Sequence, residues 1–330
     1  MLSQLATNRS AHRFDSRLWN MSSRAKRGIC FFFALALALG ATCVSAQTLA
    51  KRPRISGIAE VRFFSTDLTA ARNFYTEVLG DRKMSLNSFA VNPRQVVALF
   101  EAPSPAPSNL FAEVVFETDS LPELLRYLTA KEIQVTPKLV SVQRGDVVRP
   151  AYSALSVIDP EGHRVSFIAK TKPPLPPNRL STTRPTKALR IIHAGFVVHD
   201  RAAMDHFYKD ILDFHVYWHG GMKDNETNWV DMQVPDGTDW LEYMLNVPAN
   251  ADKPTLGVMN HIALGVPDIH AAQQQLLKDG WRGSEAPQIG RDGKWQLNLY
   301  DPDGTRVELM EFTPVEKPCC SEYTGPHPKL

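Results

Sequence analysis

Two regions of the chain repeat one pattern of apolar and polar positions. Each opens with an apolar stretch typical of a strand, at residues 58–64 and at residues 191–198. An amphipathic helix is predicted next, and Asp67 or Asp200 stands where a helix N-cap is preferred. An aromatic pair then follows at matching offsets, Phe74 and Tyr75 in the first region and Phe207 and Tyr208 in the second.

Each region divides again into two similar parts. Residues 111–116 and 260–266 repeat the opening strand, and a second amphipathic helix is predicted after each. Near the end of both regions stands the phrase Asp-Pro-x-Gly, at Asp159 and Asp301, which is typical of a tight turn between antiparallel strands. The pattern therefore predicts an α+β fold of four βαβββ modules in two pairs.

A proline-rich stretch separates the two regions. Residues 171–187 are expected to form a stiff, extended linker. It divides a first domain at 55–170 from a second domain at 188–314, and residues 315–330 form a C-terminal tail. A chain of 330 residues is large enough for two domains of this size.

The N-terminus is typical of an export signal. A basic cluster at residues 24–27 precedes an apolar run at residues 30–39, and Val44-Ser45-Ala46 resembles a signal-peptidase site. We expect residues 1–46 to be a signal peptide and the mature protein to be secreted or periplasmic. Met21 is an alternative start, and an uncleaved anchor helix is the alternative interpretation, although the apolar run is short for a membrane span.

Charge and cysteine content add to this picture. The full chain has a net charge of +2, and residues 1–46 contain six Lys or Arg and one Asp, so the mature protein is close to −3. This balance does not suggest nucleic acid or an anionic membrane as a partner. The only cysteines beyond the signal are Cys319 and Cys320, which could join in a strained ring or bridge two chains.

Four residues carry the candidate chemistry. His193 precedes Glu242 by 49 positions, and His261 precedes Glu308 by 47. In each pair the His lies on the first strand and the Glu on the last strand of one module. Two imidazoles and two carboxylates that face inward can hold one divalent cation.

Taken together, the two His and two Glu positions favour a metal site over a purely structural role. A single His on a strand is more often hydrogen-bonded than a ligand. Glu308, however, alternates with apolar Val307 and Leu309, and a charge buried in such a strand needs a compensating partner. Glu242 is the weakest of the four, because it could instead be a base beside a three-ligand site made by the others.

The repeated motifs of the chain resemble those of the vicinal oxygen chelate superfamily, which includes glyoxalase I, bleomycin- and fosfomycin-resistance proteins and type I extradiol dioxygenases. The resemblance rests on Asp200 with Phe207-Tyr208, on residues 260–264, and on residues 299–309. It implies that each pair of modules forms a U-shaped, half-barrel mixed sheet flanked by helices. It further implies one divalent ion (Zn, Ni, Mn or Fe(II)) held by His193, Glu242, His261 and Glu308.

The first region is expected to share the fold but not the metal. In the repeat alignment its residues at the four ligand positions are Glu60, Val97, Ala112 and Ser166. We therefore expect residues 55–170 to be a partner domain that resembles the second half of a dimer. A second ligand pocket without metal is the alternative, and a homodimer of the whole chain remains open.

Three functions compete for the second region, all of them with a small-molecule ligand. The first is a glyoxalase-like lyase or isomerase, in which Glu242 or Glu308 moves a proton. The second is an extradiol dioxygenase; Tyr300 supports it, because a Tyr stands at the matching place in those enzymes, but residues 291–295 lack the family's catalytic His. The third is a non-catalytic binder with an aromatic groove supplied by Trp218, Trp229, Trp240 and Trp295. We expect a metal-dependent enzyme whose reaction is open between the first two, of which the first fits the four-ligand set best.

Overall fold

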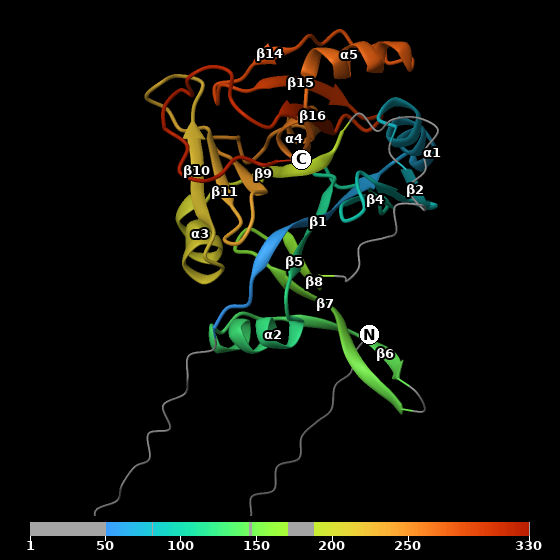
Figure 1. Cartoon of the computed structure of the whole chain (residues 1–330), viewed down its shortest axis with the longest axis vertical. Coiled ribbons are helices and arrows are strands. Elements are labelled where there is room, and N and C mark those ends of the chain that lie inside the picture. Colours follow the sequence, from blue (N-terminus) through green and yellow to red (C-terminus); the bar gives the residue numbers. More distant parts are fainter. Residues whose placement is uncertain (1–50, 81, 145–146, 171–187, 330) are drawn as a thin grey trace, which may run out of the picture. The chain divides into compact units, whose positions relative to one another are not determined.

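The computed structural model describes residues 51–80, 82–144, 147–170 and 188–329, which belong to one compact unit (Figure 1). The expected signal peptide at 1–46 and the expected linker at 171–187 lie outside the described residues. Within the part that is described, no helix combines the length and the apolar character that crossing a membrane requires.

The first half of the chain forms an eight-stranded sheet with the strand order β2-β3-β4-β1-β5-β8-β7-β6. Its elements are β1 (Ile55–Ser65), α1 (Leu68–Asn73), the π-helical turn η1 (Phe74–Val78), β2 (Arg82–Ser85), β3 (Ser88–Ala90), β4 (Val96–Glu101), β5 (Phe111–Thr118), α2 (Leu121–Ala130), β6 (Thr136–Arg144), β7 (Val147–Ile158) and β8 (Arg164–Ala169).

The second half forms a second eight-stranded sheet with the order β10-β11-β12-β9-β13-β16-β15-β14. Its elements are β9 (Arg190–Val197), α3 (Arg201–Asp205), the π-helical turn η3 (His206–Ile211), β10 (His215–Gly220), β11 (Trp229–Gln233), β12 (Trp240–Met244), α4 (Lys253–Met259), β13 (His261–Val266), α5 (Ile269–Lys278), β14 (Gln288–Ile289), β15 (Trp295–Tyr300) and β16 (Arg306–Glu311).

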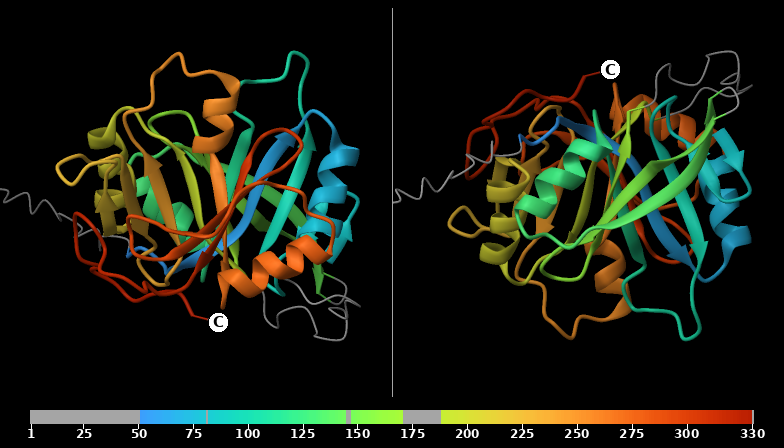
Figure 2. Two further views of the ribbon diagram at one scale, coloured as in Figure 1. Left: turned by 90° about the horizontal axis from the view of Figure 1, so that it is seen from above. Right: turned by 90° about the horizontal axis from the view of Figure 1, so that it is seen from below.

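The two sheets have the same strand order, and each contains two βαβββ modules, which confirms the predicted α+β fold. In each sheet the two opening strands pair antiparallel at the centre, and each pairs in parallel with the last strand of its own module. Helix α2 packs on β7 and β8, and α5 packs on β15 and β16, outside the curled sheets (Figure 2). Only α4, between β12 and β13, was not predicted from the repeat.

The predicted N-caps explain where the helices begin. Asp67 accepts hydrogen bonds from the backbone N–H groups of Thr69 and Ala70, both at 3.0 Å. Asp200 accepts one from the Ala203 N–H at 3.0 Å. Each carboxylate satisfies donors that the first helical turn leaves without a partner.

Strand register shows which positions of the two halves correspond. Glu60 occupies the position of His193, and Ser166 that of Glu308, as predicted. The other two alignments were wrong by one residue. Glu113 occupies the position of His261.

The fourth position, that of Glu242, is occupied by Ala98 rather than Val97. The error at β5 has a physical cause, because Arg62 pairs with Glu113 and Phe63 with Phe111, so Ala112 is an extra residue in a β-bulge. A bulge shifts every later side chain by one position, and an apolar pattern does not reveal it.

One arginine forms ion pairs with both carboxylates at the first half's equivalent of the metal position. The Arg62 Nε donates to Glu60 Oε1 at 2.8 Å, and its Nη1 forms a short ion pair with Glu113. Ser166 donates to Glu113 from the far side. No cluster of possible metal ligands is found among the described residues of this half.

The two halves are joined by side chains that reach across at equivalent positions. Gln95 precedes β4, and its amide bonds to Ile191 twice, accepting from the N–H at 2.8 Å and donating to the carbonyl at 2.9 Å. Asp239 precedes β12 and accepts from the Ile58 N–H at 2.9 Å. All four residues are buried, so β1 and β9 are tied together in the interior.

Candidate metal centre

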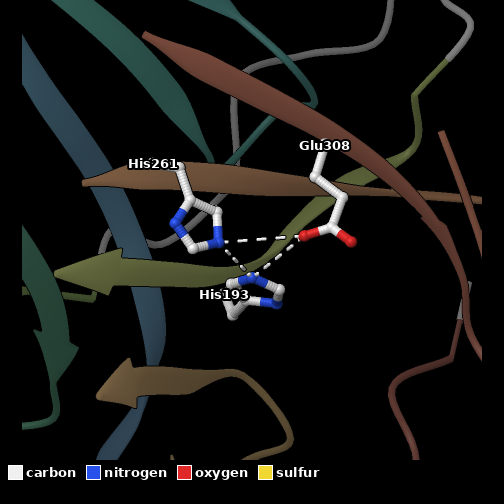
Figure 3. Close-up of side chains that lie close together, drawn as sticks. All are labelled: His193, His261 and Glu308. Carbon is white, nitrogen blue, oxygen red and sulfur yellow. Dashed lines mark hydrogen bonds and ion pairs between the residues drawn. The ribbon is translucent and has the colours of Figure 1, made fainter. Parts of the chain in front are cut away.

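The two histidines and Glu308 meet at the middle of the second sheet. His193 lies on β9, His261 begins β13 and Glu308 lies on β16, and their side chains point toward one another (Figure 3). The two Nε2 atoms are 3.1 Å apart. Glu308 Oε2 lies 3.6 Å from His193 Nε2 and 3.8 Å from His261 Nε2. All three side chains are buried.

Glu242 adjoins this trio from β12. Its Oε2 lies 3.1 Å from His261 Nε2 and 3.7 Å from His193 Nε2, and 14% of the side chain is exposed. Atoms that bind one ion at about 2.0–2.2 Å lie about 3–3.6 Å from one another in a tetrahedral or octahedral set. The fold thus brings the four predicted residues close to ligand separation, and His193, His261 and Glu308 form a buried group whose possible ligand atoms all lie within 4.8 Å of one another.

A glycine makes room for one of the imidazoles. Gly195 lies opposite His261 in the β9–β13 register. A Cβ atom at Gly195 would lie 2.1 Å from Cε1 and 2.4 Å from Nδ1 of His261. Only glycine therefore allows the His261 ring to lie across β9 at this point.

Electrostatics also suits a cation at this place. Burial raises the pKa of the Glu308 carboxyl to about 8, because a carboxylate without a counter-charge is costly in this interior. Burial lowers the pKa of His193 and His261, so both rings are neutral, which is the form that binds metals. A divalent ion would satisfy both imidazoles and compensate the carboxylate, so the residues fit the metal that was predicted.

Sequence analysis missed Arg306, which lies in the same cluster. Its Nη2 donates to His261 Nε2 at 2.7 Å and lies 3.9 Å from Glu242 Oε2. Arg306 precedes Glu308 by two residues on β16, so the strand period of two places both side chains on one face. That periodicity could have identified the arginine.

A cavity of about 360 Å³ opens above the cluster. Three of the four candidate tryptophans line it, Trp218, Trp229 and Trp240, whereas Trp295 packs against the core. The polar residues Asp231, Gln296 and Asn298 also line the cavity. Its lining also includes His193, Glu242, Glu308, Arg291, Asp292, Arg306, Met222 and Met310.

Tyr300 lies away from the trio. It is 41% exposed and pairs with Arg306 across β15 and β16, two residues beyond the register pair of Asn298 and Glu308. It lines a separate pocket with Phe74, and the two pockets share Asn298.

A buried lysine, not recognised in the sequence, lies beneath the cavity wall. Lys294 has no exposed surface, and its Nζ lies 4.6 Å from the ring centre of Trp240 and 4.9 Å from that of Tyr323. Its nearest acidic oxygen is Asp292 Oδ2, at 3.8 Å. Burial lowers the pKa of this amine. Residues 291–295 had been notable only for lacking a His, yet they supply the buried cation.

The C-terminal tail is part of the same assembly. Tyr323 donates to the Asp292 carbonyl at 2.7 Å, and the Trp218 indole donates to the Cys319 carbonyl at 3.1 Å. Cys319 and Cys320 are joined to each other by a disulfide. The tail therefore covers the aromatic wall behind the cavity instead of extending from the domain.

Comparison with known proteins agrees with this geometry. Residues 190–309 match the family model described as the Glyoxalase/Bleomycin resistance protein/Dioxygenase superfamily. The second half of the chain therefore matches this superfamily in sequence, and the predicted resemblance is confirmed. A search of curated protein sequences finds no match.

Solved structures of homoprotocatechuate 2,3-dioxygenases share the fold. A variant from B. fuscum is 18% identical with a TM-score of 0.56, and the match covers 84% of this chain and 76% of that one. The native enzyme from Arthrobacter globiformis is 18% identical with a TM-score of 0.57, covering 79% and 81%. A Brevibacterium fuscum complex with 3,4-dihydroxyphenylacetate is 19% identical with a TM-score of 0.54, covering 84% of both chains. Because the identity is low, the likeness establishes the fold alone.

Proposed function

We propose that the protein is a metal-dependent enzyme that binds a small molecule through two neighbouring oxygen atoms on one divalent cation. The observation that carries the proposal is the buried cluster of His193, His261 and Glu308 beneath a cavity. A bound cation supplies Lewis acidity, which favours the negatively charged form of the two substrate oxygens.

Glu242 is the residue that we assign to proton transfer. It is the most exposed of the four acid and imidazole side chains, and it lines the cavity beside the trio. A carboxylate in this place can accept a proton from a carbon next to a chelating oxygen and return it to the neighbouring carbon. This is glyoxalase-like lyase or isomerase chemistry.

An extradiol-type dioxygenase is the second candidate. The two-His, one-carboxylate set is the arrangement of non-haem Fe(II) oxygenases, and the solved structures of similar fold are dioxygenases. Against it, His193 is the sole histidine among the described residues that line the cavity, so no further imidazole is placed there as a base. A non-catalytic binder is the third, favoured by the three tryptophans of the wall.

Metal analysis and two assays test the proposal on the purified mature protein. We expect about one divalent ion per chain, and loss of that ion in the His193→Ala/His261→Ala double variant. Isomerisation of a hydrated 2-oxoaldehyde (the aldehyde plus one water) to the 2-hydroxy acid, without oxygen uptake, would support the first reaction. Oxygen uptake with catechols would favour the second. Full metal content in the double variant would overturn the site.

The Glu242→Gln variant tests whether Glu242 acts as a base or as a fourth metal ligand. The amide cannot accept the proton, so we expect activity to fall by about 100-fold or more while metal content stays near that of the wild type. Metal content is measured beside turnover in the same preparation. Parallel loss of the metal and of activity would make Glu242 a fourth ligand and contradict this role.

We also propose that residues 1–46 direct export and are removed. The support is the basic cluster, the apolar run and the Val44-Ser45-Ala46 site. N-terminal sequencing of the exported protein should begin near Gln47. A cytosolic protein that retains the apolar run at residues 30–39 would contradict this.

A further inference from the structure

One carboxylate in the cavity has an unused acceptor. Asp231 lies on β11, directly opposite Glu242 on β12. It lines the cavity and is only 3% exposed. Its Oδ1 is buried and accepts no hydrogen bond from any described residue.

Buried acceptors in folded proteins almost always have a donor, supplied by the protein, by water or by a ligand. Paired side chains on neighbouring strands point to the same face of a sheet. Asp231 therefore lies one strand outward of Glu242, on a strand that carries none of the candidate ligands. Water, or a molecule that extends along the cavity past Glu242, can supply the donor that reaches it.

The nearby cations do not fill this role. Lys294 compensates negative charge from behind the wall, but its Nζ makes no hydrogen bond to the described residues and does not line the cavity. Arg291 donates to the Gly221 carbonyl at 3.1 Å and pairs with Asp224 at the surface. Arg306 is bonded to His261. Burial raises the pKa of the Asp231 carboxyl well above its ordinary value, and the nearby Lys294 offsets this only in part. Asp231 Oδ1 therefore has no partner among the described residues.

We propose that Asp231 receives a hydrogen-bond donor, such as a hydroxyl group, that the substrate carries on the side away from its two chelating oxygens. This proposal rests on the proposed metal function and adds a second point of recognition to it. The substrate class is then a small chelating diol or its equivalent with a donor-bearing substituent. A cavity of about 360 Å³ has room for one substituted ring of this kind.

A matched set of ligands tests the inference without turnover. The mature protein is loaded with Zn²⁺, which has no redox chemistry, and titrated in a calorimeter with 4-ethylcatechol, 4-(2-hydroxyethyl)catechol and 3,4-dihydroxyphenylacetate. The first two differ only in the hydroxyl group. The variants are Asp231→Ala, Asp231→Asn, and Asp210→Ala as a control that removes an exposed carboxylate far from the cavity lining.

We expect the wild type and Asp210→Ala to bind the hydroxyethyl ligand about tenfold more tightly than 4-ethylcatechol, which is the advantage that one additional hydrogen bond provides. Asp231→Ala should reduce this ratio to about twofold or less, with Asp231→Asn in between, while 4-ethylcatechol binds as before. Zinc content and the melting temperature verify that the variants are folded and loaded.

The outcomes separate this inference from the proposed function. If 4-ethylcatechol binds but the hydroxyl gives no advantage in the wild type, or the advantage persists in Asp231→Ala, the inference alone is wrong. Tighter binding of 3,4-dihydroxyphenylacetate than of the hydroxyethyl ligand would also overturn it. If none of the catechols binds the zinc-loaded protein, chelation of a diol fails and the inference fails with it, whereas the proposed lyase or isomerase function is decided by the assay with 2-oxoaldehydes.

Discussion

The residue opposite each candidate ligand determines what its position can hold. In the second half Gly195 leaves the space that the His261 ring occupies. In the first half the equivalent residue is Arg62, and it pairs with Glu113 at the position of His261. The same point in the two sheets therefore contains either a histidine available to a metal or a guanidinium that already provides the positive charge.

Gly195→Ala should damage the metal centre selectively. Because the new Cβ overlaps the ring of His261, the imidazole must move, and misplacing a ligand typically costs about 10–100-fold in metal affinity. Competition with a chromophoric chelator measures the loss.

The matched control for this variant is Gly265→Ala, also in the sheet. A Cβ there would meet Phe312 and Ile192, which are not ligands, so this change should lower stability but leave metal affinity within about threefold. Metal affinity of Gly195→Ala equal to that of the wild type would show that the ring does not need this space.

The candidate ligands were predictable from the chain because the repeat fixes their strand and face. The intervals of 49 and 47 residues placed His193, Glu242, His261 and Glu308 on central strands, and the fold brings them together. Lys294 was not predictable in the same way. Its burial depends on aromatic rings from β10, β12 and the tail, which are distant in sequence.

At the scale of the elements, the halves are held together by two equivalent loop residues. Gln95 bonds to both the N–H and the carbonyl of Ile191 and donates to the Ile58 carbonyl, while Asp239 accepts from the Ile58 N–H. The backbone groups that they satisfy lie in the first strands of both sheets, β1 and β9. Because His193 follows Ile191 by two residues, this junction also fixes the strand that carries a candidate ligand.

Gln95→Ala should destabilise the whole protein. It leaves a buried N–H and a buried carbonyl of Ile191 without partners, and each such loss costs about 1–3 kcal/mol. Urea unfolding should show a free energy of unfolding lower by about 2–4 kcal/mol.

An exposed glutamine provides the comparison for that change. Gln273 on α5 makes one exposed contact with the Glu285 carbonyl, so Gln273→Ala should change the free energy of unfolding by less than about 0.5 kcal/mol. Equal unfolding midpoints for the two variants would mean that the Gln95 hydrogen bonds at the junction do not stabilise the fold.

The order of strands and helices could be predicted from the sequence, but their register could not. Repeated apolar strands, Asp caps and Asp-Pro-x-Gly turns specify the modules locally. The bulge at Ala112 and the helix α4 do not follow from that pattern, because each depends on how neighbouring strands fit together. The two register errors in the first half have the same cause, because the apolar pattern does not show how neighbouring strands align.

At the scale of the whole molecule, folding buries the Glu308 carboxyl and favours its protonated form as long as no cation is bound. Glu308 has an ordinary pKa of 4.5, and burial raises it to about 8 in the folded protein. Folding of the metal-free protein therefore binds a proton between these two values. The contribution of this group to stability is present below pH 4.5 and is lost as the pH rises toward about 8.

Metal binding should reverse that dependence. The cation requires the ionised carboxylate, so below about pH 8 each binding event must release the proton of Glu308. His193 and His261 contribute no proton in this range, because burial has already lowered the pKa of both rings. We expect the apparent metal affinity to rise by about tenfold per pH unit from about pH 6 to pH 8 and then to level off. Calorimetry in buffers of different ionisation enthalpy should count about one proton released at pH 7, and an affinity that stays flat from pH 6 to pH 8 would contradict the assignment of Glu308 as a ligand.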